Sequence, residues 1–108
     1  MAKAVLIVTS SPASPEQESD FNRWYDEVHV GQIKAAIPAI TTVCRYKQLD
    51  VEQAGGPARY VAVYEMDSED IPAALAALDA AMTAGNVSPT DTMDLTVAPP
   101  QLVWATGV

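Results

Sequence analysis

The sequence is poor in the residues that build cross-links and metal sites. It has one cysteine, Cys44, and one histidine, His29, among 108 residues. A single cysteine forms no internal disulfide, and one cysteine with one histidine supplies too few ligands for a structural zinc site. We therefore expect no metal and no other cofactor, and we expect Cys44 to be a buried strand residue in a reducing compartment.

Basic residues and long apolar runs are also scarce. Six Lys and Arg stand against 14 Asp and Glu, which gives a formal net charge of -8. A field of this sign repels nucleic-acid backbones and anionic membranes. No apolar run approaches the ~18–20 residues of a membrane-spanning helix, and the residues after Met1 do not have the form of a signal peptide. We expect a cytoplasmic protein without nucleic-acid or membrane partners, folded as a single domain over residues 1–108.

Four short runs of the sequence have the composition of β-strands. They are β-branched and apolar, and they cover residues 4–9, 41–47, 59–66 and 93–97. The second and third runs are separated by a short segment with the turn residues 55–57, Gly-Gly-Pro. This spacing predicts an antiparallel hairpin.

Two longer segments have the periodicity of helices. The first covers residues 15–37, with Ser14 before it and Pro15 at its first position. Its expected buried face, at ~100° per residue, holds Phe21, Trp24, Tyr25, Val28, Gln32, Ala35 and Ala36. Gly31 favours a kink within it. The second helix begins with Asp70 as its cap and ends at Gly85-Asn86.

The resulting order β-α-β-β-α-β predicts an α+β, ferredoxin-like fold. Its four-stranded antiparallel sheet carries both helices on one face. The other face then lacks a cover, although it includes apolar and aromatic residues. A second copy of the sheet is the natural cover, so we expect a homodimer.

His29 is the candidate for chemistry because it is the only side chain with an ordinary pKa near neutrality. It lies about 80° from Phe21 on the helical wheel, at the edge of the expected buried face. Asp26 and Tyr25 are one turn away and Asn22 lies on the same side two turns back. Asp26 is placed to orient the imidazole or raise its basicity. The alternative is a partly buried structural histidine, which is the commoner situation.

A sequence motif around His29 resembles a known family. The segment 21–29 reads F-N-R-W-Y-D-E-V-H and is followed by Ile37-Pro38 and Arg45-Tyr46. It is similar to the EthD-like branch of the dimeric α+β barrel superfamily, whose members have F-N-x-W-Y-D-E-x-H-x-P, a proline-containing turn and a strand with R-Y. The resemblance covers about the first half of the chain. It implies a homodimer with face-to-face sheets and a pocket between helices and sheet in each subunit.

By residue, the resemblance places His29 in that pocket with Asp26 and Tyr25 beside it. Asn22 and Trp24 are further candidate substrate contacts. Trp24 belongs either to the core or to the pocket wall, and its size favours the core.

Tyr60 and Tyr64 share one face of the third strand by its period of two. If that face meets the helices, their hydroxyls are placed to bind a substrate carbonyl or phenol. If it meets the partner subunit, they are interface residues. Arg45 is expected to be solvated or salt-bridged rather than to hold an anionic group.

These features predict a small cofactor-independent enzyme acting on a hydrophobic aromatic or polyketide-like carbonyl compound. Relatives in the wider superfamily include cofactor-free monooxygenases, polyketide cyclases, decarboxylases and lactone isomerases. His29 would be general base or acid, Asp26 its orienter, and a tyrosine a donor to a developing oxyanion. The reaction would be a cyclisation, isomerisation, elimination or oxygenation.

Two other hypotheses remain open from the sequence. The chain is alternatively a non-catalytic binding or accessory protein of a catabolic or biosynthetic pathway, which holds a small hydrophobic molecule in the same pocket. A purely structural dimerisation module would have no pocket between helix and sheet.

Overall fold

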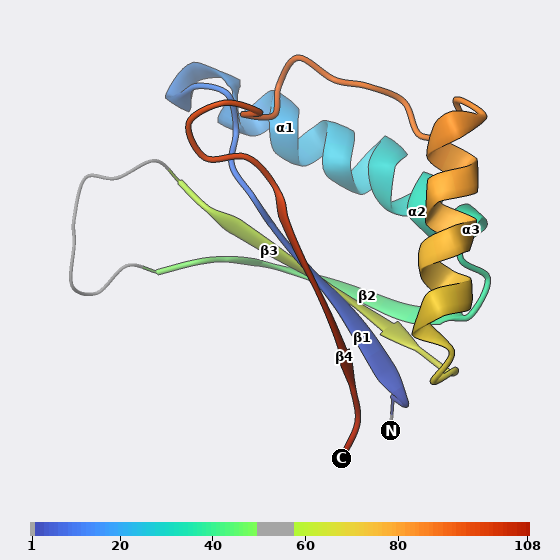
Figure 1. The fold of residues 1–108 in the computed structure, drawn as a ribbon. Helices are drawn as coiled ribbons and strands as arrows, with labels where there is room; N and C mark the ends of the chain where they lie inside the picture. Colours follow the sequence, from blue (N-terminus) through green and yellow to red (C-terminus); the bar gives the residue numbers. More distant parts are fainter. Residues whose placement is uncertain (1, 50–57) are drawn as a thin grey trace.

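The computed structural model describes residues 2–49 and 58–108, so the expected turn at 55–57 lies outside the described residues. Figure 1 shows how the elements are arranged. In chain order they are β1 (Ala4–Ser10), a 3-10 turn (Pro15–Gln17), α1 (Glu18–Trp24), a π-helical turn (Tyr25–His29), α2 (Val30–Ala36), β2 (Ile40–Lys47), β3 (Tyr60–Met66), α3 (Ile71–Thr83) and β4 (Gln101–Thr106).

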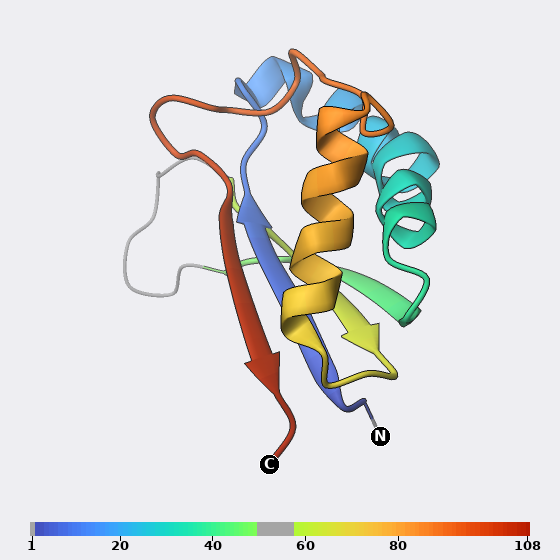
Figure 2. The ribbon, with the colours of Figure 1, turned by 45° about the vertical axis from the view of Figure 1, so that its right-hand side comes forward.

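The four strands form one sheet in the order β2-β3-β1-β4, and every neighbouring pair is antiparallel. At the centre of the sheet, Val63 of β3 pairs with Ile7 of β1 and with Cys44 of β2. The helical segments all lie over the same face of the sheet (Figure 2). This confirms the predicted ferredoxin-like α+β fold and the hairpin of the second and third strands.

The fourth strand lies later in the chain than the sequence pattern predicts. Residues 93–97 form no strand, and β4 pairs with β1 instead. The carboxylate of Asp94 accepts hydrogen bonds from the backbone N–H groups two, three and four residues later, at 2.9, 3.1 and 3.1 Å. These donors are used in a local turn and are lost to a sheet ladder. Pro99 and Pro100 have no N–H to donate, so strand pairing begins only after them.

The first helix runs without a break from Pro15 to Ala36, and its irregularity is the π turn at Tyr25–His29 rather than a kink at Gly31. At the end of this turn the N–H of Val30 donates to the carbonyl of Tyr25, five residues back.

The π turn changes which residues face the sheet. Phe21, Tyr25, Ile33 and Ile37 are buried, and they fall on a spacing of four residues that includes His29. In a regular α-helix each step of four residues drifts by about 40°. The longer π turn absorbs part of this drift and keeps His29 and Ile33 toward the sheet. The expected core residue Val28 is 38% exposed instead.

The second helix has the predicted ends. The carboxylate of Asp70 accepts a hydrogen bond from the N–H of Ala73 at 3.1 Å. Gly85 has a φ of 79°, the left-handed conformation that ends helices and that glycine adopts without strain. Within the described residues, no helix is long and apolar enough to cross a membrane.

The sheet has one covered face and one open face. Leu6, Tyr64 and Met66 are buried beneath the helices. The alternate strand positions point the other way, and the apolar residues among them include Val5, Ile7, Val61, Val63, Tyr46 and Val103. Cys44 is on this face and is exposed, so the prediction of a buried thiol is wrong for the single chain. The helices of the described residues lie on the opposite face of the sheet, over Leu6, Tyr64 and Met66.

Candidate functional site

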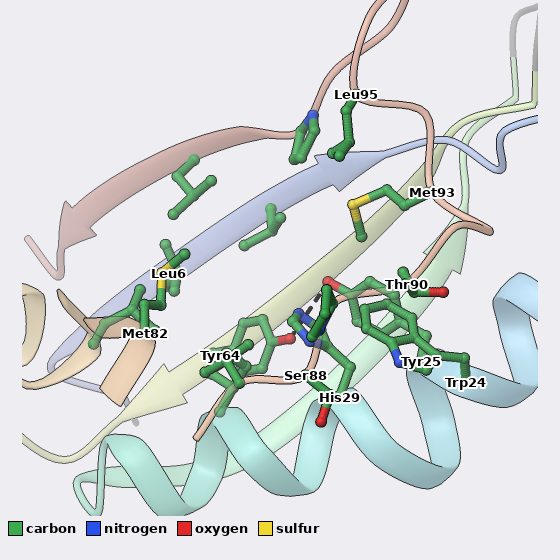
Figure 3. Close-up of a pocket in the computed structure, with 17 residues that line it drawn as sticks. Leu6, Trp24, Tyr25, His29, Tyr64, Met82, Ser88, Thr90, Met93 and Leu95 are labelled. Carbon is green, nitrogen blue, oxygen red and sulfur yellow. Dashed lines mark hydrogen bonds between the residues drawn. The ribbon is translucent and has the colours of Figure 1, made fainter. Parts of the chain in front are cut away.

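A cavity of about 270 Å³ lies between the first helix, the sheet and α3. Its walls come from β1, β3, β4, α3, the π turn and the segment 87–100 (Figure 3). Almost all the lining side chains are apolar, with Leu6, Met82 and Met93 as examples. The polar groups in the lining are on Tyr25, His29, Tyr64, Ser88 and Thr90, together with the indole N–H of Trp24. Among residues 2–49 and 58–108, no Lys, Arg, Asp or Glu lines the cavity.

The segment 87–100 covers one side of the cavity and is fastened at several points. The side-chain amide of Gln32 donates to Ser88 Oγ, and Ser88 N–H donates back to Gln32 Oε1, both at 2.8 Å. At the far end, the guanidinium of Arg59 donates to the carbonyl of Ala98 at 3.0 Å. This wall is therefore held on the helix at one end and on the sheet at the other.

The segment also supplies cavity residues that sequence reasoning missed. Ser88, Thr90, Met93 and Leu95 all line the cavity. A prediction that made residues 93–97 a strand had no reason to place them over the first helix. The only sequence signal for a covering loop is its irregular composition, with proline at 89, 99 and 100.

His29 stands at the cavity wall between aromatic rings. Its ring is stacked with Trp24 at a centroid distance of 4.6 Å and meets Tyr25 edge to face at 4.7 Å. Figure 3 shows the imidazole projecting from the helix toward the cavity. Its Nδ1 atom is buried and has no hydrogen-bond partner among the described residues. Trp24 is half-buried: it packs against the hydrophobic core and also lines the cavity.

Burial and the nearby charge of Arg45 keep the imidazole of His29 uncharged at neutral pH. Burial lowers the pKa of the imidazole to about 4, and the positive charge of Arg45 acts in the same direction. The ring is therefore neutral at physiological pH. It is available as a hydrogen-bonding group and as a weak base, but it holds no imidazolium proton to give as a general acid.

Two tyrosines form a hydroxyl pair at the inner end of the cavity. The hydroxyl of Tyr64 donates to the hydroxyl of Tyr25 at 3.4 Å, and both residues are buried. Burial raises the pKa of each phenol, so both stay protonated at neutral pH. Tyr64 thus faces the helices and the cavity, which decides between the two orientations left open by the sequence.

Tyr60 faces the same side of the sheet but lies outside the cavity lining. Its hydroxyl donates to Glu18 and accepts a hydrogen bond from the side chain of Asn22 at 3.1 Å. Tyr60 therefore ties β3 to the start of the first helix, and neither it nor Asn22 contacts the cavity.

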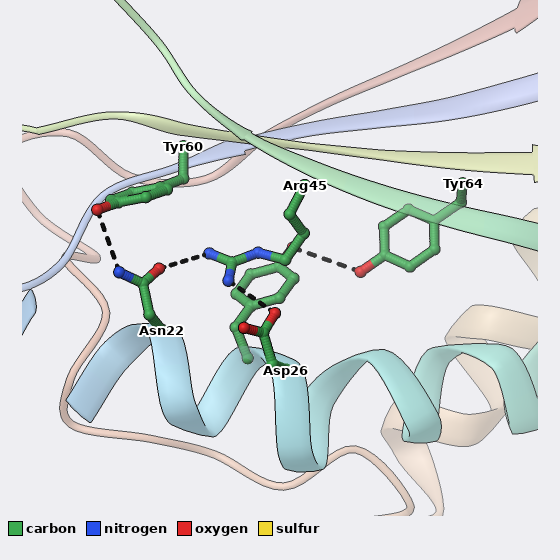
Figure 4. Close-up of polar contacts among 6 residues, drawn as sticks. Asn22, Asp26, Arg45, Tyr60 and Tyr64 are labelled. Atoms are coloured by element: carbon green, nitrogen blue, oxygen red, sulfur yellow. Dashed lines mark hydrogen bonds and ion pairs between the residues drawn. The ribbon is translucent and has the colours of Figure 1, made fainter. Parts of the chain in front are cut away.

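Asp26 binds Arg45 (Figure 4). The guanidinium of Arg45 donates to Asp26 Oδ1 and to Asn22 Oδ1, both at 2.9 Å, and lies 4.2 Å from the centre of the Tyr25 ring. The carboxylate of Asp26 is 63% exposed. The expected pairing of Asp26 with the imidazole is thus not formed, because the stronger charge partner is Arg45. The expectation that Arg45 is salt-bridged agrees with this geometry.

The lining determines what the site accepts. Within residues 2–49 and 58–108, no three His, Cys, Asp or Glu side chains gather as metal ligands. With no charged side chain in the wall, an anionic or cationic group would lose its hydration without gaining a partner. The arrangement fits an uncharged, largely apolar molecule with a few hydrogen-bonding atoms.

Comparisons with known proteins identify the fold from structure rather than from sequence. No family model matches the chain, and no curated protein matches its sequence. Among solved structures, an ethyl tert-butyl ether d (EthD) family protein from Bacillus halodurans is 14% identical with a TM-score of 0.56, covering 97% of this chain and 99% of that one. HapK from Hahella chejuensis is 13% identical with a TM-score of 0.59, covering 97% and 92%.

A third similar structure is a monooxygenase from the gene ActVA-Orf6 of Streptomyces coelicolor, in complex with the ligand Nanaomycin D. It is 14% identical with a TM-score of 0.56, and the match covers 99% of this chain and 88% of that one. At such identities the likeness concerns the fold alone. It confirms at that level the resemblance first noted around His29. The chain therefore has the ferredoxin-like fold that EthD family proteins also adopt.

Proposed function

We propose that this protein is a small cofactor-independent enzyme that binds an uncharged aromatic or polyketide-like carbonyl compound in the cavity beside His29. The observation that carries the proposal is the combination of a nearly apolar cavity of about 270 Å³ with one histidine in its wall. A cavity of this size and lining suits a small hydrophobic molecule. The histidine supplies a polar contact at a defined point of that molecule.

The chemistry proposed is activation of the substrate's carbonyl group by hydrogen bonds to its oxygen. Such reactions include the cyclisations, isomerisations, eliminations and oxygenations expected from the sequence. His29 contacts the reacting part of the substrate, and the Tyr25–Tyr64 hydroxyl pair, 3.4 Å apart, lies beside it. The nearly apolar wall offers few competing polar contacts, which strengthens each hydrogen bond to a developing negative charge. That one similar structure is a monooxygenase with a bound ligand supports this class of reaction.

We further propose that two copies pair through the open faces of their sheets. The support is the set of apolar residues on that face, which no helix of the described chain covers. A stable homodimer would bury these residues and Cys44 together. The cavity lies on the other side of the sheet, so dimerisation leaves it within each subunit.

His29→Ala tests the enzymatic proposal. A panel of aromatic ketones and polyketide-like compounds is incubated with the protein, and products are detected by mass spectrometry. With an active compound, we expect His29→Ala to lower kcat/KM by about 10²–10³-fold, the usual contribution of one hydrogen-bond donor to a developing oxyanion. The matched control is Lys34→Ala, an exposed position on the same helix. Full activity in a folded His29→Ala protein would rule out the assignment.

A second candidate function is a non-catalytic binding protein that uses the same cavity. The observation in its favour is that His29 has no carboxylate partner among the described residues, because Asp26 is held by Arg45. Thermal-shift binding of panel compounds without any product, and a His29→Ala variant altered only in affinity, would favour this candidate over the enzyme.

A further inference from the structure

We propose that His29 presents its Nε2–H to the cavity as a hydrogen-bond donor, so the bound molecule places an uncharged acceptor oxygen, a ketone or enone carbonyl, at this point. This inference rests on the proposed function only in taking the cavity as the binding site. It assigns the imidazole a different task from that of a proton acceptor.

Only one of the two ring nitrogens of His29 is open to a ligand. Nδ1 of His29 has no accessible surface and no partner among the described residues. The ring projects from the helix toward the cavity (Figure 3), and Nε2 is in the outer half of the ring, away from the backbone. Nε2 is therefore the nitrogen that a bound molecule contacts.

The neutral ring carries a single N–H proton, which is on either Nδ1 or Nε2. If it were on Nδ1, an N–H donor would be buried without an acceptor, which is the costly arrangement for a strong donor. If it is on Nε2, Nδ1 buries only a lone pair, and an unpaired acceptor is tolerated more often than an unpaired N–H donor. This difference favours the Nε2–H form.

The groups packed around the His29 ring do not supply an acceptor for its Nε2–H. Trp24 and Tyr25 meet it with their aromatic rings. The hydroxyl of Tyr64 already donates to that of Tyr25. The carboxylate of Asp26 is engaged by Arg45. Among the described residues none has a hydrogen bond to His29, so the ligand itself is the acceptor for Nε2–H.

The charged groups near the cavity determine which net charge a ligand can carry. Arg45 is the cation closest to the site, but it lies against the Tyr25 ring and is held by Asp26 and Asn22. It does not line the cavity. A carboxylate or phosphate would therefore meet only apolar walls and neutral donors. The chemistry that fits is a neutral carbonyl, whose oxygen accepts a hydrogen bond from the neutral imidazole N–H.

The tautomer is tested directly on the free protein by ¹⁵N NMR of the imidazole, which is unambiguous because the chain has a single histidine. Couplings to the ring protons identify the two nitrogens. We expect the proton on Nε2 at neutral pH, and a spectrum with the proton on Nδ1 would overturn the inference. This readout does not depend on whether the protein is an enzyme.

The ligand class is tested with three probes of similar shape, namely 1-tetralone, tetralin and 1-naphthoate, by titration calorimetry. We expect 1-tetralone to bind at least about tenfold more tightly than either of the others. His29→Gln places an amide N–H near the position of Nε2 and is expected to keep this preference, whereas His29→Phe is expected to abolish it. Equal binding of 1-tetralone and tetralin, or tighter binding of 1-naphthoate, would contradict the inference. Failure of all three probes to bind would instead count against the cavity as the site.

Discussion

Phe21→Ala lowers the midpoint of thermal unfolding by at least about 12 °C. Phe21 is fully buried, and its ring lies 5.7 Å from the rings of both Tyr25 and Tyr60. Removing a buried phenylalanine costs about 3–5 kcal/mol, and in a domain of this size each kcal/mol corresponds to about 4–8 °C. The loss is a large part of the roughly 5–15 kcal/mol that stabilises a small domain. Calorimetry or circular dichroism measures it.

Phe21 has this effect because it joins the three parts that hold the site. It packs on the aromatic side chains of the first helix and of β3, and the guanidinium of Arg45 on β2 lies 5.7 Å from its ring centre. Arg23→Ala is the matched control, since it is exposed two residues away. Surface substitutions of this kind shift stability by only about 0.5 kcal/mol. A Phe21→Ala midpoint no lower than that of the control would mean that the helix does not pack on the sheet as described.

The second large effect is expected on the association of two subunits into a homodimer. Val63→Glu is expected to convert a homodimer into a monomer. Val63 lies at the centre of the open sheet face, paired with Ile7 and Cys44. In a two-fold interface the substitution buries two carboxylates, and an unpaired buried charge costs at least about 3 kcal/mol. That cost corresponds to a dissociation constant more than about 10²-fold weaker.

Sedimentation equilibrium of the unmodified protein and of the Val63→Glu variant measures the two dissociation constants. The control is Ala80→Glu, which adds the same charge to an exposed position of α3, on the other side of the sheet. We expect the control to remain dimeric. If the unmodified protein is itself a monomer, or if Val63→Glu and Ala80→Glu sediment alike, the sheet face is not the interface.

Much of the fold was predictable because local signals and tertiary packing agree. The β-branched runs of the first three strands are where the pattern placed them, and Asp70 and Gly85 end α3 as their chemistry requires. The fourth strand was misplaced because residues 93–97 alternate like a strand. The hydrogen bonds of the Asp94 carboxylate to the backbone following it decide otherwise, and no periodicity reveals them.

The candidate site was predictable at His29 and less so around it. A helical wheel assumes a constant angle per residue, so it put His29 at the edge of the buried face and Val28 within it. The π turn at Tyr25–His29 reverses that order. The partner of Asp26 was also out of reach, because Arg45 comes from a strand 19 residues away. The long-range placement of residues 87–100 over the cavity depends on where the fourth strand begins.

Methionine methyl NMR tests most directly whether the cavity beside His29 is the binding site. Met82 and Met93 line the cavity, whereas Met66 is buried elsewhere beneath α3. With ¹³C-methyl-labelled methionine and 1-tetralone as the probe, we predict shifts of the Met82 and Met93 signals while Met66 stays in place. A saturable titration that moves Met66 and leaves Met82 and Met93 unchanged would show that the probe binds outside the cavity.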